Sequence, residues 1–189
     1  MRRSGTLLPA VWLGTVVSAH AAVGMQELAR NEISGPVTVF YPMESAPRVE
    51  QRGAFRLELA VSAVPSPGNA RLVVISHGSP GSPWVHFDLA RTLVDAGFTV
   101  ALPEHYADNY KDDSGPGPPS WRRRPVEVSL AIDRLSREPA FASRLDLRRV
   151  GMFGMSAGGH TALTLAGGRW SPSQLRRDCQ LHIAEDFHA

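Results

Sequence analysis

Cysteine is almost absent from this sequence. Cys179 is the single cysteine among 189 residues, so the chain cannot close an internal disulfide. No glycine-rich turn surrounds Cys179, which argues against a thiol nucleophile. An excess of one charge is also lacking, because 20 Lys and Arg residues oppose 18 Asp and Glu residues. The resulting net charge of +2 is too small to indicate a nucleic-acid partner.

Motifs for nucleotides and metals are missing as well. Neither G-x-G-x-x-G nor G-x-x-x-x-G-K occurs, which disfavours a dinucleotide or phosphate loop. The segment 182–188 brings His182, Glu185, Asp186 and His188 together in sequence, but this spacing matches no established zinc motif. We therefore expect a solvated segment there and no bound metal ion.

No apolar run reaches the roughly 20 residues that a membrane span needs. The N-terminus instead has the three parts of a signal peptide. Arg2 and Arg3 form a positive region, 6–17 is an apolar run, and Ala19-His20-Ala21 has the A-x-A pattern. We predict cleavage after Ala21, no stable membrane span afterwards, and a periplasmic or secreted protein.

The remaining residues, 22–189, alternate between strand and helix patterns. Such alternation predicts one α/β domain with a doubly wound, mostly parallel sheet. Residues 54–61 alternate apolar and polar, which favours a half-buried strand in an antiparallel edge region. A long loop is expected over 105–125. Strands are expected at 36–41, 54–61, 71–76, 98–102 and 149–153, and helices at 86–97, 126–137 and 157–166.

The sequence Gly154-Met155-Ser156-Ala157-Gly158 follows the apolar strand 149–153 and precedes a helix. This is the G-x-S-x-G nucleophile elbow of α/β-hydrolases. Glycines 154 and 158 allow a tight turn and a close approach of strand and helix. We predict Ser156 as the nucleophile and the N–H of Ala157 as an oxyanion donor. The alternative is a glycine-rich turn that serves packing only.

A second motif, His77-Gly78-Ser79-Pro80-Gly81, stands at the end of the predicted strand 71–76. The corresponding loop of α/β-hydrolases supplies the other oxyanion N–H, so Ser79 is the candidate donor. His77 precedes the serine, whereas this fold orders its triad as serine, acid, histidine. His77 is therefore interpreted as an orienting or structural residue.

Four polar or aromatic residues of the loop 105–125 are predicted to line a substrate pocket, with a plain surface loop as the alternative. Long loops at strand ends of α/β sheets commonly bind ligands. These residues are Tyr106, Asn109, Tyr110 and Trp121.

The acid and the base of a triad are not evident after Ser156. Only 33 residues, 157–189, follow it. His160 lies on the helix that begins at the elbow and is expected to point away from the active site. We expect the sequence to be the N-terminal part of a hydrolase, with the C-terminal strands missing.

Beyond the elbow, residues 24–189 resemble the bacterial "predicted dienelactone hydrolase" group, which is related to platelet-activating-factor acetylhydrolases and to polyester-cleaving hydrolases. The resemblance implies an α/β-hydrolase fold, a Ser-Asp-His triad, and hydrolysis of carboxylic esters or lactones without metal or organic cofactor. The segments that carry it are 74–82, Leu102-Pro103-Glu104-His105, Asp108-Asn109-Tyr110, Arg124-Pro125-Val126-Glu127-Val128 and 149–159.

Two hypotheses follow. The preferred one is an exported serine hydrolase that acts on a small ester or lactone. The other is a non-catalytic hydrolase scaffold that acts as a binding module. Acyl transfer is a third possibility, because the same nucleophile and oxyanion donors serve both reactions.

Overall fold

The computed structural model describes residues 22–183. The predicted signal peptide, 1–21, and the residues 185–188 of the His/Glu/Asp segment lie outside this part of the chain, so the interpretations made for them stay predictions. The strands are β1 (Ala22–Leu28), β2 (Val37–Met43), β3 (Arg48–Arg52), β4 (Phe55–Val61), β5 (Leu72–Ser76), β6 (Thr99–Pro103) and β7 (Val150–Gly154). The helices are η1 (Pro83–His86), α1 (Phe87–Asp95), α2 (Pro118–Leu135), α3 (Ala157–Leu165) and α4 (Pro172–His182).

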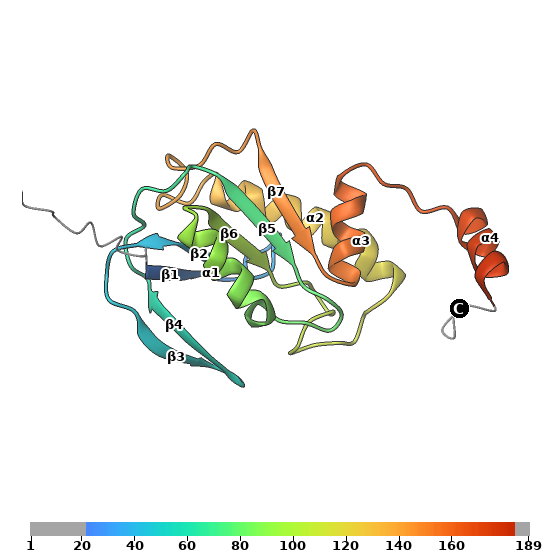
Figure 1. Ribbon diagram of the computed structural model, residues 1–189, viewed down its shortest axis with the longest axis horizontal. Coiled ribbons are helices and arrows are strands. Elements are labelled where there is room, and N and C mark those ends of the chain that lie inside the picture. Colours follow the sequence, from blue (N-terminus) through green and yellow to red (C-terminus); the bar gives the residue numbers. More distant parts are fainter. Residues whose placement is uncertain (1–21, 184–189) are drawn as a thin grey trace, which may run out of the picture.

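The strands form one sheet in the order β3-β4-β1-β2-β6-β5-β7 (Figure 1). β6, β5 and β7 run parallel, whereas β2 is antiparallel to both of its neighbours. β4 pairs antiparallel with the edge strand β3, which confirms the antiparallel edge region predicted for 54–61. Ser76 of β5 pairs with Gly154 of β7, so the strands that carry the two predicted oxyanion donors end side by side.

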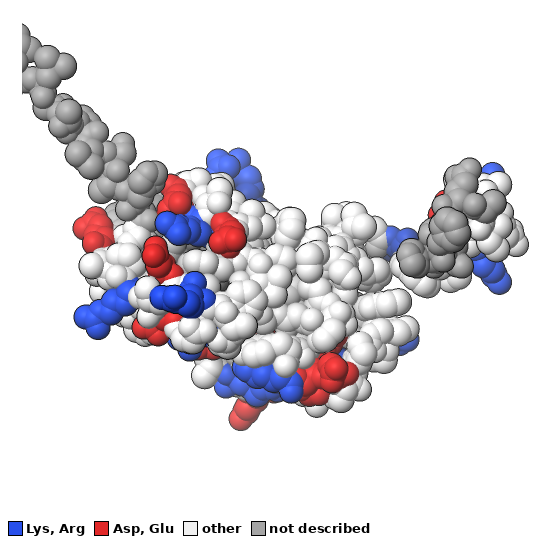
Figure 2. Space-filling model, turned by 60° about the horizontal axis from the view of Figure 1, so that its bottom comes forward, with Lys and Arg blue, Asp and Glu red and all other residues white. Residues whose placement is uncertain are grey.

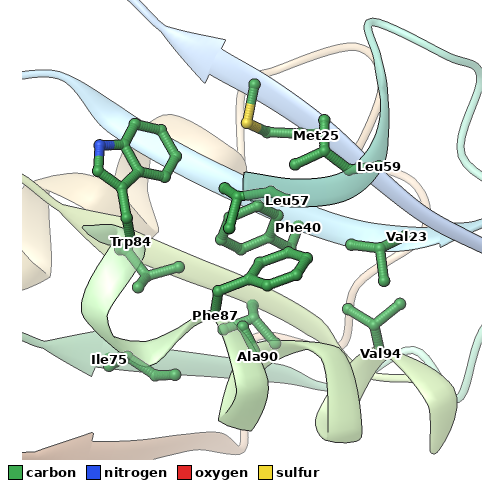
Figure 3. Packing of buried hydrophobic residues seen from close by; sticks show 12 residues of the cluster. Val23, Met25, Phe40, Leu57, Leu59, Ile75, Trp84, Phe87, Ala90 and Val94 are labelled. Carbon is green, nitrogen blue, oxygen red and sulfur yellow. The ribbon is translucent and has the colours of Figure 1, made fainter. Parts of the chain in front are cut away.

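Helices cover both faces of the sheet. α1 buries Phe87, Ala90 and Val94, which are spaced along one helical stripe, against one face. Figure 3 shows this layer, in which the Phe87 and Phe40 rings meet edge to face at 5.3 Å. The opposite face packs against the stripe of α2, which consists of Val128, Ala131 and Leu135. α3 contacts β7, β5 and α2 and therefore lies on the α2 side.

Proline placement explains two differences from the predicted elements. β2 continues through Pro42, although we expected it to end there. β6 pairs with β2 only from Val37 to Phe40, so β2 has no β6 partner at Pro42. A proline is tolerated there because it has no backbone N–H to donate to a neighbouring strand. The predicted loop 105–125 is wrong beyond residue 117, because α2 begins at Pro118. Proline suits a first helical turn, and the buried stripe of α2 outweighs the interruption at Pro125.

Four further elements were not predicted: β1, β3, η1 and α4. β1 contains a glycine at position 24, but it pairs with β2 along its whole length. α4 buries none of its residues, and in Figure 1 it stands apart from the sheet. No helix within residues 22–183 combines the length and apolarity that crossing a bilayer requires.

Charged side chains of both signs are interspersed on the face shown in Figure 2, and a broad part of that face carries none. Neither sign dominates this face, in keeping with the net charge of +2. The expected absence of a nucleic-acid partner stays a prediction.

Candidate active site

The chain bends sharply between β7 and α3. Ser156 has φ 52° and ψ −119°, a conformation that residues other than glycine rarely adopt. Glycines make the bend possible: a Cβ on Gly158 would lie 2.0 Å from the Ser76 carbonyl oxygen, and a Cβ on Gly154 would lie 2.0 Å from the Gly158 carbonyl oxygen. The close approach of strand and helix predicted from these glycines is therefore confirmed. The role of Ser156 as nucleophile stays a prediction.

A cleft of about 330 Å³ opens beside this bend. Ser156 is exposed and lines the cleft together with Met155, Val85 and His86. The segment 77–81, which we call the oxyanion loop, lines the same cleft. The structure thus brings Ser156 and Ser79, 77 residues apart in the sequence, to one cavity.

The two predicted oxyanion donors are unpaired. Among residues 22–183, no acceptor receives a hydrogen bond from the backbone N–H of Ser79 or from that of Ala157. Unpaired, preorganised N–H groups near a nucleophile are what stabilises a developing oxyanion. Both groups are therefore free to bind one.

Arg124 fastens the oxyanion loop to α2. Its side chain is fully buried, and Nη1 donates to the His77 carbonyl at 2.5 Å. Nη2 donates to the Gly78 carbonyl at 3.1 Å and forms a 2.9 Å ion pair with Asp108. A planar guanidinium suits this task because its donors point in several fixed directions. The Arg124 side chain consequently holds the oxyanion loop through two of its carbonyl groups.

Asp108 is the counter-charge of Arg124 and is itself fully buried. It accepts hydrogen bonds from the Ser79 and Ser120 hydroxyls. Burial alone would raise the pKa of Asp108, but these hydroxyl donors and the Arg124 charge lower it below its usual value. Asp108 therefore stays ionised and holds the Ser79 side chain through its hydroxyl.

His77 and His105 lie against each other with ring centroids 4.8 Å apart. Nδ1 of His77 hydrogen-bonds the Gly78 carbonyl at 2.7 Å, and Nε2 receives the His105 backbone N–H at 3.4 Å. Burial, followed by the electrostatic effect of the neighbouring His105 ring, lowers the pKa of His77 to about 3. Both ring nitrogens of His77 are thus engaged, which agrees with an orienting or structural residue and leaves no atom to act as a base.

Sequence reasoning missed a second hydrogen-bonded group, which we call the His105 network. His105 Nε2 lies 2.7 Å from the Ser76 hydroxyl, and its Nδ1 lies 2.6 Å from Glu127 Oε2. Glu127 Oε1 also accepts the Tyr106 backbone N–H at 3.1 Å. The only sequence signal was the presence of His105 and Glu127 in the segments that carry the family resemblance.

Comparison with known proteins adds one likeness at the level of structure. No family model and no curated protein sequence matches the chain. A solved structure of the ferulic acid esterase from Streptomyces cinnamoneus matches with a TM-score of 0.65 and 21% sequence identity. The chain has an α/β-hydrolase fold. The match covers 79% of this chain and 56% of the esterase, so the chain spans little more than half the length of that relative.

The α/β-hydrolase fold places a nucleophile at the sharp turn between a strand and the following helix, which is where Ser156 lies, between β7 and α3. The resemblance to the dienelactone hydrolase group in particular stays a prediction. The same holds for the expectation that the chain is the N-terminal part of a longer hydrolase.

The predicted pocket residues after β6 do not line the Ser156 cleft. Tyr106 and Tyr110 are about half exposed, and Tyr106 lies between the guanidinium groups of Arg30 and Arg123 at 5.5 and 5.3 Å. Asn109 is buried instead: its Nδ2 donates to the His105 carbonyl at 2.7 Å. Asn109 therefore shapes its own loop, and a substrate-binding role for the three residues stays a prediction.

Trp121 lies on α2, not in the loop where we had placed it. It lines a larger cleft of about 690 Å³ between α2 and the segment that follows α3. Its ring centroid is 5.4 Å from that of His160 and 5.8 Å from that of Trp170. His160 thus lies in this second cleft and not among the residues that line the Ser156 cleft, as expected from its place on the helix.

No side chain among residues 22–183 hydrogen-bonds the Ser156 hydroxyl, so the structure assigns no general base to it. His86 lines the same cleft, yet its Nε2 is shielded from solvent and unpaired, and the ring packs edge to face against Phe153. Burial lowers the pKa of His86. No group of three potential metal ligands occurs within the described range.

Proposed function

We propose that this protein is a serine hydrolase of carboxylic esters or lactones. Ser156 is the nucleophile, and the backbone N–H groups of Ala157 and Ser79 form the oxyanion hole. The observation that carries the proposal is the exposed Ser156 in a left-handed bend, in one cleft with Ser79, while both N–H groups lack an acceptor within the described structure.

The chemistry follows the usual two steps of acyl transfer to water. The Ser156 oxygen attacks the ester carbonyl carbon as its proton passes to a base, and the carbonyl oxygen becomes an oxyanion. The two N–H groups bind that oxyanion, the ester C–O bond breaks, and the alcohol leaves with a proton. Water then attacks the acyl-enzyme and releases the acid. We assign the proton acceptor to no residue between 22 and 183.

The likeness to a ferulic acid esterase supports hydrolysis of carboxylic esters. The resemblance to the dienelactone hydrolase group extends the proposed substrates to lactones. The proposed mechanism needs neither a metal ion nor an organic cofactor, because backbone amides stabilise the charge that develops.

Labelling with a fluorophosphonate probe tests the nucleophile. We expect the full chain to be labelled and Ser156→Ala to lose the label, together with any hydrolysis of p-nitrophenyl esters. Ser129→Ala on the exposed side of α2 is the matched control, and its labelling should equal that of the wild type. A label that persists in Ser156→Ala, or a wild-type chain that takes none, contradicts the proposal.

We also propose that the hydrolase is exported, since residues 1–21 have the pattern of a cleavable signal peptide. N-terminal sequencing of the protein secreted by a bacterial host should begin at Ala22. An intact Met1 on protein from the periplasm would be evidence against this.

A non-catalytic scaffold that serves as a binding module is the second candidate. It is favoured by one observation: no side chain among the described residues hydrogen-bonds the Ser156 hydroxyl. A monomer that melts cooperatively, binds small esters and neither takes the label nor turns over substrate would support this candidate over the first.

A further inference from the structure

The His105 network has the outward form of a second Ser-His-acid triad. Ser76 ends β5, His105 follows β6, and Glu127 lies on α2, so three separate elements supply its members. The hydrogen bonds from His105 to Ser76 and Glu127 measure 2.7 and 2.6 Å. Such short contacts between the buried Ser76 and His105 and the partly buried Glu127 indicate a fixed arrangement.

The direction of each hydrogen bond follows from Glu127. An ionised carboxylate can only accept, so His105 Nδ1 carries the hydrogen that it donates to Oε2. Burial, together with the nearby Arg124 charge, outweighs Glu127 and keeps the pKa of His105 low, so the ring is neutral. Nε2 is then an acceptor, and the Ser76 hydroxyl must donate to it.

This arrangement does not serve nucleophilic attack by Ser76. Ser76 and His105 are both fully buried, so an acyl carbon has no route to the Ser76 oxygen. The cleft beside Ser156 includes His77 and Gly78 but neither Ser76 nor His105. The network therefore acts on the shape of the site rather than on a substrate.

His105 contacts both residues at which β5 turns into the oxyanion loop. Its Nε2 receives the Ser76 hydroxyl, and its backbone N–H points at His77 Nε2 at 3.4 Å. The His77 and His105 rings are also packed together. Whatever orients His105 consequently sets the direction in which the oxyanion loop leaves the sheet.

We propose that His105 and Glu127 are positioning residues: Glu127 orients His105, and the hydrogen bonds of His105 to Ser76 and His77 aim the Ser79 N–H at the cleft beside Ser156. The inference rests on the proposed function, since it assigns a purpose to the Ser79 N–H. Arg124 holds the oxyanion loop through its carbonyl groups, and the His105 network holds the same loop at its start.

Glu127→Gln is the sharpest test. The carboxylate accepts two N–H groups, one from His105 and one from Tyr106, whereas an amide has a single acceptor oxygen. Either one N–H then faces an NH₂ group, or His105 changes to the other tautomer and reverses its hydrogen bond with Ser76; both outcomes disturb the contact at the start of the oxyanion loop. Ser76→Ala is a second, milder variant that removes only the hydroxyl. Asp133→Asn, an exposed carboxylate on the same helix, is the matched control.

Two measurements are made on the full chain: the rate of fluorophosphonate labelling and the ¹⁵N–¹H resonances of the Ser79 and Ala157 amides. We expect Glu127→Gln and Ser76→Ala to slow labelling about tenfold or more, because a displacement of about 1 Å in a site can reduce rates about a hundredfold. The Ser79 resonance should shift, whereas Ala157, held by the glycine contacts of the elbow, should keep its position. Asp133→Asn should change neither.

The result that overturns the inference is a Ser79 resonance at the wild-type position in both variants. Equal shifts of Ser79 and Ala157 also overturn it, since they indicate general loosening. If the wild-type chain takes no label, the proposed function fails, and the Ser79 resonance alone then decides whether the His105 network positions this loop.

Discussion

Replacing Arg124 by methionine tests how firmly the oxyanion loop is fastened. Arg124 and Asp108 are both fully buried, and methionine keeps much of the side-chain volume while it removes the charge and every donor. Asp108 would then be a buried carboxylate without its cation. The carbonyl groups of His77 and Gly78 would lose their donor at the same time.

Removing one partner of a buried ion pair typically destabilises a protein by about 3–5 kcal/mol. For a chain of this size, each kcal/mol lowers the melting temperature by about 2–4 °C, so Arg124→Met should melt roughly 6–20 °C below the wild type. The free energy of unfolding should fall less when Asp108 is changed as well, because the double variant leaves no buried charge without a partner. We expect a coupling of about 2 kcal/mol between Arg124→Met and Asp108→Asn.

Urea unfolding followed by circular dichroism measures these free energies. Arg148→Met is the control, because Arg148 pairs with Asp146 on the surface, where its side chain is 86% exposed. Solvent screens such a surface pair and it contributes little to stability, so this control should unfold almost as the wild type does. Equal destabilisation by Arg124→Met and Arg148→Met, or strict additivity with Asp108→Asn, would refute the reasoning.

Three further predictions concern the elbow and its surroundings. Gly158→Ala should abolish labelling, because the new Cβ would lie 2.0 Å from the Ser76 carbonyl oxygen. It should also lower the free energy of unfolding by about 3 kcal/mol, the upper range for overpacking. Gly159→Ala is the control in the same urea assay and should be tolerated, because its Cβ would have its nearest contact at 3.4 Å. Ser156→Gly should be about 1 kcal/mol more stable than Ser156→Ala, since glycine adopts φ 52° without strain, and equal stabilities would argue against a strained bend. Below pH 6.5 the unfolded chain protonates His77, whereas the folded chain, in which the pKa of His77 is about 3, does not. The contribution of His77 to the free energy of unfolding should therefore be fully present above pH 6.5 and fall by about 1.4 kcal/mol per pH unit towards pH 3. His77→Asn should flatten this slope in unfolding curves measured across that range.

Local patterns sufficed for the elements that carry the elbow. The run 149–153 and the small residues at 154 and 158 predicted a strand, a tight turn and a helix, and the structure contains all three. The apolar stripes of α1 and of the second half of α2 were likewise evident from their spacing. Proline misled the prediction at 42 and at 118–125, because its effect depends on whether a partner needs its N–H, which a single sequence does not show.

The sequence by itself determined an α/β chain with a serine in a glycine-flanked bend, since turn geometry and hydrophobic periodicity are short-range properties. Only the tertiary structure decided which distant groups meet there. The Arg124–Asp108 pair and the His105 network join residues that are between 16 and 47 positions apart and lie on different strands, helices and loops. Their hydrogen bonds depend on the order and register of β5, β6 and α2, which no local pattern specifies.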